Sequence, residues 1–147
     1  MNDTWKKELK EFLNTTFSMG TEKIELYIEA LTHSSAGSPN NQRLAFLGDS
    51  VLRLIIREYY FREHPSWDND RLHDASVIVE DDENFAHIAT NLKILGYMKF
   101  GKTYDDRPED KDITTIKAEV FEALFGAFYL DQGLDKARDV AQKLRII

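Results

Sequence analysis

The sequence predicts an all-α protein of about seven to eight helices. Three observations support this: apolar residues recur three and four positions apart through most of the chain, no segment alternates long enough to form a strand, and there is no internal repeat or low-complexity linker. At 147 residues the chain can build one hydrophobic core. We therefore expect a single domain over residues 1–147.

Composition narrows the class of protein. Hydrophobic residues make up 42% and charged residues 31%, which is typical of a soluble protein. The absence of cysteine excludes a disulfide framework, a thiolate zinc site and a cysteine nucleophile. No apolar run approaches the roughly 20 residues of a membrane span, and the N-terminus resembles an amphipathic helix rather than a signal peptide. We expect a cytoplasmic protein without a membrane partner.

The net charge of −7 argues against binding nucleic acid by overall charge alone. It leaves open a local basic face beside an acidic metal pocket, because net charge says nothing about where charges gather in space.

The first two helices follow from apolar periodicity and capping residues. Asp3 or Thr4 can cap a helix that runs to about Asn14, and residues 18–21 then break the periodicity. A shorter helix is expected over residues 22–31. A polar turn follows, in which we expect His33 to make structural hydrogen bonds rather than act as a base.

The stretch 41–60 predicts the central helix. Its apolar stripe comprises Leu44, Leu47, Val51, Leu54 and Ile55. Gly48 and Asp49 are poor helix formers within this stripe. Glycine would let a second helix approach closely, whereas a buried carboxylate would need a compensating partner. The alternative is that Asp49 points off the edge of the stripe into water.

The remaining helices follow in order. Periodicity resumes over 72–79 and 85–92, and the acidic run 80–84 between them is typical of a solvated helix start. A long helix is expected over 113–130, and residues 131–133 should end it before a last helix over 134–144. The expected core stripe of the long helix is Ile116, Val120, Leu124, Ala127 and Phe128.

Two segments resemble a known family. LAFLGDSVL at 44–52 resembles the signature E-R-L-E-F-L-G-D-[SA]-V-L of the ribonuclease III family, and KAEVFEALFGAFYLD at 117–131 resembles its second catalytic block. The resemblance extends over roughly 31–144. It implies that Asp49 and Glu122 are catalytic residues, and that Asp49, Glu119 and Glu122 bind a metal. It further implies outer roles for Asp82 and Glu83.

Spacing supports this assignment in part. Glu119 and Glu122 lie three positions apart, so on a helix they share a face. Together with Asp49 they would present carboxylate oxygens, which suit Mg²⁺ or Mn²⁺. The alternative for these two residues is a pair of solvated glutamates on a surface helix.

The resemblance implies a metal-dependent endoribonuclease that cleaves double-stranded or structured RNA, leaving 5′-phosphate and 3′-hydroxyl ends. One catalytic face per chain implies a homodimer, with Phe46 and Leu47 at its interface. An ordinary core position for Phe46 is the alternative.

The chain departs from the family pattern in three places. Gln42 and Ala45 stand where the family has glutamate, and the family's double-stranded-RNA-binding domain is not included. A short branch of the family also has alanine at the second position and cleaves RNA, and an engineered change at Ala45 is a further possibility. Ala45 favours an alternative function: a catalytically degenerate fold acting as a dimeric RNA- or ribosome-binding subunit.

Residues 96–103 satisfy the phosphate-loop pattern G-x-x-x-x-G-K-[ST]. Such a loop needs a buried strand before it and a helix after it. Here the pattern follows a helix and precedes an acidic segment that contains Pro108, so we expect no nucleotide cofactor.

Overall fold

The computed structural model describes residues 3–102 and 110–147, without the side chains of 110–112. This part of the chain is helical, and its only β-type pairing is an isolated parallel bridge between Thr32 and Lys99. The predicted all-α class is therefore correct. The α-helices are α1 (Asp3–Phe17), α2 (Ile24–Ala30), α3 (Gln42–Glu63), α4 (Asn69–Val79), α5 (Asp82–Asn91) and α6 (Asp110–Lys143), with two short 3-10 helices, η1 (Ser34–Ala36) and η2 (Ile94–Tyr97).

The expected seven to eight helices exceed the six α-helices of the described residues. The difference arises at the end of the long helix, where a break was expected at residues 131–133. The backbone does leave the helical region at Gly133 (φ 88°, ψ 176°). The next helical turn starts at once, so the two expected helices form one kinked element, α6.

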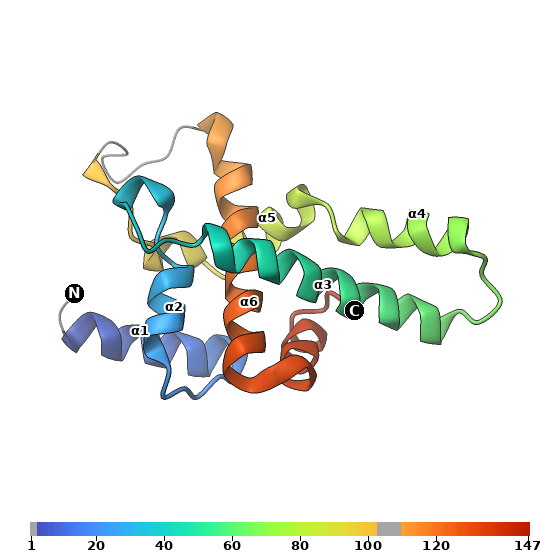
Figure 1. Cartoon of the computed structure of the whole chain (residues 1–147), viewed down its shortest axis with the longest axis horizontal. Coiled ribbons are helices and arrows are strands. Elements are labelled where there is room, and N and C mark those ends of the chain that lie inside the picture. Colours follow the sequence, from blue (N-terminus) through green and yellow to red (C-terminus); the bar gives the residue numbers. More distant parts are fainter. Residues whose placement is uncertain (1–2, 103–109) are drawn as a thin grey trace.

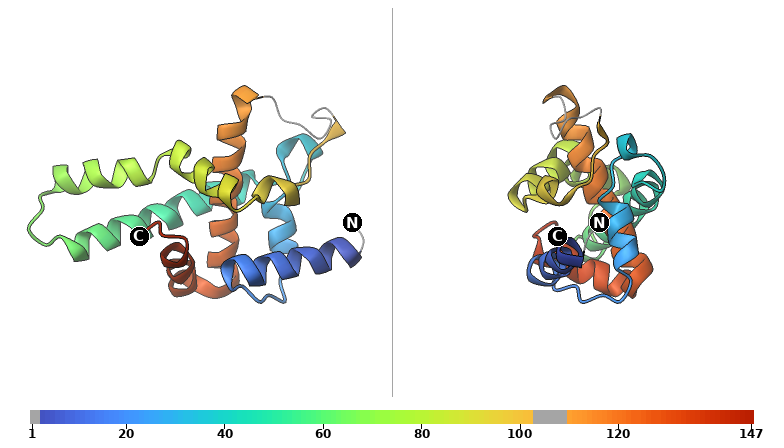
Figure 2. Two further views of the ribbon diagram at one scale, coloured as in Figure 1. Left: turned by 180° about the vertical axis from the view of Figure 1, so that it is seen from behind. Right: turned by 90° about the vertical axis from the view of Figure 1, so that its left-hand side faces the viewer.

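Helix α6 is the centre of the molecule. It lies between α3 on one side and α5 on the other (Figure 2), and its most extensive contacts are with these two helices. The predicted core stripe of α6 is confirmed, since all five of its residues are buried. Tyr27 of α2 is also fully buried, and its hydroxyl donates to Asp131 Oδ2 at 2.7 Å, which ties α2 to α6.

The second half of α3 and all of α4 form an antiparallel arm that extends from the body (Figure 1). The prediction that Leu54 belongs to the buried stripe is wrong, because this side chain is 51% exposed. Phe61 and Ile78 are also exposed on the arm, and Ser76 is the one buried residue of α4. The physical reason is that two helices on their own bury only the surfaces that face each other.

Aspartate side chains cap the starts of two helices. Asp68 and Asp81 cap α4 and α5, each accepting a hydrogen bond from a backbone N–H of the first turn. The break after α1 is also confirmed, with Ser18 in the left-handed region at φ 54°. His33 is buried, and its Nδ1 accepts from the Ser35 N–H at 3.1 Å, in agreement with a structural role.

The phosphate-loop pattern has no strand before it in the described residues: α5 ends at Asn91 and η2 precedes the pattern's second glycine. Its last residue, Thr103, and most of the acidic segment after it lie outside the described residues. Among the described helices, none combines the length and the apolar composition needed to cross a membrane.

Candidate active site

Two glycines allow α3 and α6 to cross in backbone contact. A Cβ on Gly48 would overlap the carbonyl oxygen of Glu122, and one on Gly126 would overlap the carbonyl oxygen of Leu44. The expectation that Gly48 permits a close helix approach is therefore confirmed. The crossing brings Asp49, the residue after Gly48, next to Glu122.

Beside this crossing lies an open cavity of about 360 Å³, which we call the acidic cavity. Its wall comes from α3, the first turn of α5 and α6. It contains four carboxylates, three of them on the predicted metal-binding positions. Glu83 is not among the lining residues, because it lies one residue further along α5. The lining residues are Gln42, Ala45, Phe46, Asp49, Ser50, Asp82, Thr115, Ala118, Glu119 and Glu122.

The surroundings of Glu122 favour its neutral, protonated form. Burial, a hydrogen bond with Asp49, and the charges of Asp49, Asp82 and Glu119 raise the pKa of Glu122 from 4.5 to about 8. Burial also raises the pKa of Glu119. Glu122 therefore holds a proton at neutral pH when no cation is bound, and this proton lets the two carboxyl groups stand side by side.

Asp49 lies at the mouth of the cavity. Its side chain is 40% exposed and pairs with Arg53, one turn later on α3, at an Nε–Oδ1 distance of 3.2 Å. Asp49 is thus partly exposed and paired with Arg53. It is neither buried without a partner among aliphatic side chains nor directed into bulk water. This pair could have been predicted from the sequence, since oppositely charged residues four positions apart on a helix lie next to each other.

The donor set of the acidic cavity suits a hard divalent cation in its chemistry. All four charged side chains offer carboxylate oxygen, the ligand that Mg²⁺ and Mn²⁺ prefer. The negative charge of these side chains, partly neutralised by the proton on Glu122, is charge that a bound cation would neutralise. As the side chains stand, no group of three or more Asp, Glu or His residues in the described part of the chain is arranged to hold a metal ion. Binding of a metal ion in the acidic cavity would therefore require its carboxylate side chains to rotate.

Sequence reasoning missed several residues of this region. Ser50 and Thr115 offer hydroxyl groups to the cavity, and no motif distinguished them. Arg57 and Glu80 form a bidentate ion pair between α3 and the end of α4. Their separation of 23 residues leaves no trace in local sequence patterns. Ala45, by contrast, lines the cavity one turn before Asp49, where the spacing placed it.

Phe46 projects from the rim of the acidic cavity and is 83% exposed, so the interpretation as a core residue is wrong. It also borders a second, more apolar cavity of about 670 Å³, to which Leu26, Leu47 and Leu130 contribute. Leu47 is partly buried. An exposed aromatic side chain beside an apolar hollow is a feature of association surfaces.

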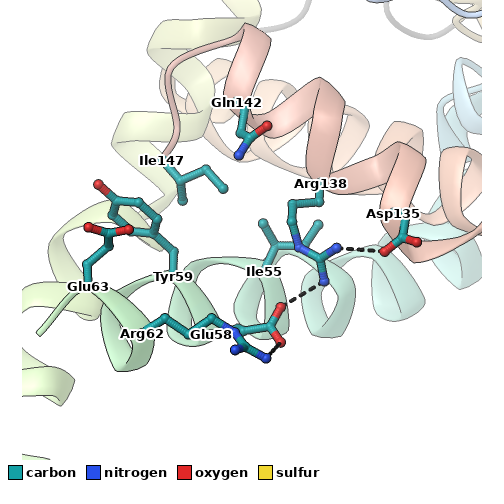
Figure 3. A pocket seen from close by; sticks show the side chains of 9 residues that line it. All are labelled: Ile55, Glu58, Tyr59, Arg62, Glu63, Asp135, Arg138, Gln142 and Ile147. Carbon is teal, nitrogen blue, oxygen red and sulfur yellow. Dashed lines mark hydrogen bonds and ion pairs between the residues drawn. The ribbon is translucent and has the colours of Figure 1, made fainter. Parts of the chain in front are cut away.

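A third cavity, of about 510 Å³, lies between α3 and the last part of α6 (Figure 3). Glu58 accepts from Arg138 at 2.7 Å and from Arg62 at 3.3 Å, and Arg138 also donates to Asp135 at 2.7 Å. Because both arginines already pair with carboxylates, this network braces α6 against α3 rather than presenting cationic groups to a ligand.

Comparison with known proteins identifies the class to which this fold and cavity belong. The family described as Ribonuclease-III-like matches residues 23–146, and the chain belongs to the ribonuclease III family. In structure it is similar to the nuclease domain of ribonuclease III from Campylobacter jejuni, with a TM-score of 0.83 and 28% identity over 91% of this chain and 94% of that domain.

Among relatives in sequence, Ribonuclease 3 of a Nitratiruptor species is 37% identical over 139 residues, which are 94% of this chain and 61% of the relative. Ribonuclease 3 of Pelotomaculum thermopropionicum is 41% identical over 125 residues, 80% of this chain and 52% of the relative. The chain thus spans between half and two thirds of the length of these relatives.

Proposed function

We propose that this chain is a metal-dependent endoribonuclease that cleaves double-stranded or structured RNA. The observation that carries the proposal is the meeting of Asp49 and Glu122 in one cavity, across a helix crossing that only glycines permit. Family membership supports the same activity. We further propose that the protein acts in the cytoplasm.

Asp49, Glu119 and Glu122 are the residues that would hold Mg²⁺ or Mn²⁺. When bound, such an ion supplies Lewis acidity to the scissile phosphate and to an attacking water. To act as a ligand Glu122 would have to be deprotonated, and a bound cation would supply the charge compensation that the proton provides without it. Asp49, at the cavity mouth, can exchange its bond with Arg53 for the ion. The hydroxyls of Ser50 and Thr115 can donate to phosphate oxygens.

We also propose a homodimer, because one acidic cavity per chain cuts one strand of a duplex. The exposed Phe46 beside an apolar cavity supports an interface at this end of α3. The similar Campylobacter jejuni nuclease domain has been described for flexibility in a region involved in dimer formation.

The proposed activity is tested by incubating purified protein with long duplex RNA, with and without Mg²⁺ or Mn²⁺, and analysing the product ends. We expect cleavage only with the divalent ion, and products with 5′-phosphate and 3′-hydroxyl ends. Cleavage that persists in excess chelator would contradict metal dependence.

Ala45 supports a second candidate, an RNA- or ribosome-binding subunit without activity, because the cavity wall lacks a carboxylate at this position. The same experiment separates the two functions. Duplex RNA that is bound but never cut, at any concentration of Mg²⁺ or Mn²⁺, would favour the binding subunit.

A further inference from the structure

The junction between α4 and α5, residues 80–82, connects the arm to the acidic cavity. Glu80 is the C-cap of α4 and Asp81 is the N-cap of α5. Asp82, the first residue of α5, lines the cavity. Only the two residues 80 and 81 therefore separate the end of α4 from Asp82, a carboxylate that shares the cavity with Glu122.

Glu80 is held by α3. Arg57 Nε donates to Glu80 Oε1 at 2.8 Å and Nη2 donates to Oε2 at 3.2 Å, which is a bidentate pair. The Glu80 side chain is only 6% exposed, whereas that of Arg57 is 47% exposed. A buried carboxylate without its arginine would be an uncompensated charge, so the pair strongly favours this one position of the junction.

Arg57 lies about two turns beyond Asp49 on α3. The helix that carries Asp49 at the cavity therefore also binds the junction, through the Arg57–Glu80 pair. A second bond, from Asn84 Nδ2 to the Val79 carbonyl at 3.0 Å, closes the turn locally without reaching α3. Among the hydrogen bonds found at this junction, the Arg57–Glu80 pair is the one that sets its place relative to Asp49.

We propose that Arg57 and Glu80 are positioning residues that hold Asp82 at the acidic cavity, where its carboxylate supplies negative charge that Ala45 does not. Ala45 and Asp82 line the same cavity from different helices, α3 and α5. This inference rests on the proposed function, since it concerns the affinity of the cavity for its cation.

The test is a double-mutant cycle read out as Mg²⁺ binding to the RNA-free protein by calorimetry. Asp82→Asn should weaken binding about tenfold, because one of the four carboxylates that line the cavity is removed. Glu80→Gln should weaken it about threefold, since the junction loses its fixed position. In the double variant we expect no further loss beyond that of Asp82→Asn, because Glu80 acts through Asp82.

Arg57→Lys tests the role of the Arg57–Glu80 pair from the arginine side, because lysine keeps the charge but not the bidentate geometry. We expect an Mg²⁺ affinity between those of wild type and Glu80→Gln. The matched control is Glu25→Gln, which breaks the exposed Lys6–Glu25 pair and should leave Mg²⁺ affinity unchanged. Circular dichroism and thermal melting establish that each variant is folded.

Three outcomes would overturn the inference: unchanged affinity in Asp82→Asn, additive losses in the double variant, or loss of stability in Glu80→Gln and Arg57→Lys without any change in Mg²⁺ affinity. In each case wild type still binds Mg²⁺ and cleaves RNA, and the proposed function stands. Failure of wild type to bind Mg²⁺ would instead contradict the proposed function itself.

Discussion

At the scale of single residues, the proposed chemistry depends on Glu122. Its pKa is raised because it is half-buried and shares a hydrogen bond with Asp49, with Asp82 and Glu119 close by. A carboxyl group that is protonated near neutral pH lies at the border between two states. As an acid it stabilises the metal-free cavity, and as a base it would be able to bind a cation.

This state predicts how stability depends on pH. Between pH 4.5 and about 8 the folded protein retains a proton on Glu122 that the unfolded chain has lost, so the free energy of unfolding should fall as pH rises through this window. Because Glu122 is only half-buried, solvent screening should limit the fall to about 1–2 kcal/mol. Denaturant unfolding at a series of pH values, without metal, measures it.

Glu122→Gln is the control for this pH dependence, since glutamine does not titrate. The variant should lose most of the slope, and saturating Mg²⁺ should remove it from wild type as well. An equal slope in wild type and Glu122→Gln would show that other groups cause the dependence.

Ala45 predicts a gain of function at the same cavity. In Ala45→Glu the new carboxylate should reach the cavity one turn before Asp49 and lower the half-saturating Mg²⁺ concentration for cleavage by about tenfold, equivalent to roughly 1.4 kcal/mol. Like-charge repulsion and the larger side chain at a buried position should lower the melting temperature without metal. An unchanged Mg²⁺ titration midpoint, with no metal-dependent gain in melting temperature over wild type, would mean that residue 45 does not face the ion.

At the scale of the helices, the crossing of α3 and α6 determines the site. Gly48 and Gly126 bring the two backbones into contact, and the carboxylates on either side of the crossing follow from that contact. The motif glycines therefore serve the site indirectly, by fixing the distance between two helices.

Gly48→Ala should consequently destabilise the protein by about 3 kcal/mol or more, since its Cβ meets backbone that cannot rotate away. Gly96→Ala is the matched control, because nothing lies within 4 Å of the position of its Cβ. Chemical denaturation of both variants measures the difference. A Gly48→Ala variant as stable as Gly96→Ala would contradict the close crossing.

Helical periodicity was sufficient to predict α3, the core stripe of α6 and the class of the fold, because each of these helices shows one apolar face to a common core. It could not predict that Leu54 is exposed, since the arm leaves the body only in three dimensions. The same limit applies to the site. Local spacing placed Glu119, Glu122 and Ala45 correctly on their helices, but the contact between Arg57 and Glu80 depends on how α3 and α4 pack.

At the scale of the whole molecule, the acidic cavity lies in the body, where α3, α5 and α6 meet. The arm extends away from the body (Figure 1). Exposed apolar side chains follow α3 from the cavity rim at Phe46 to Leu54 and Phe61 on the arm. Such a series of exposed apolar side chains is costly to leave in water, and association of two chains along α3 would cover it.

Phe46→Ala should therefore weaken the proposed homodimer by about 2 kcal/mol or more, as expected for an aromatic anchor. Sedimentation of wild type should show twice the mass of the 17.1 kDa chain, and the variant should shift toward the monomer at low micromolar concentration. Ile78→Ala, at an exposed apolar position of α4 outside this series, is the control and should leave the dimer unchanged. A monomeric wild type would contradict the dimer.

The most direct test of the account compares cleavage of long duplex RNA by wild type and by Glu122→Gln at saturating Mg²⁺. We predict cleavage by wild type and a loss of at least about a hundredfold in the variant, which should remain folded because glutamine is neutral, as is the protonated Glu122 of the metal-free protein. Equal rates for the two proteins, or no cleavage by wild type, would contradict the claim that the cavity between α3 and α6 is a nuclease active site.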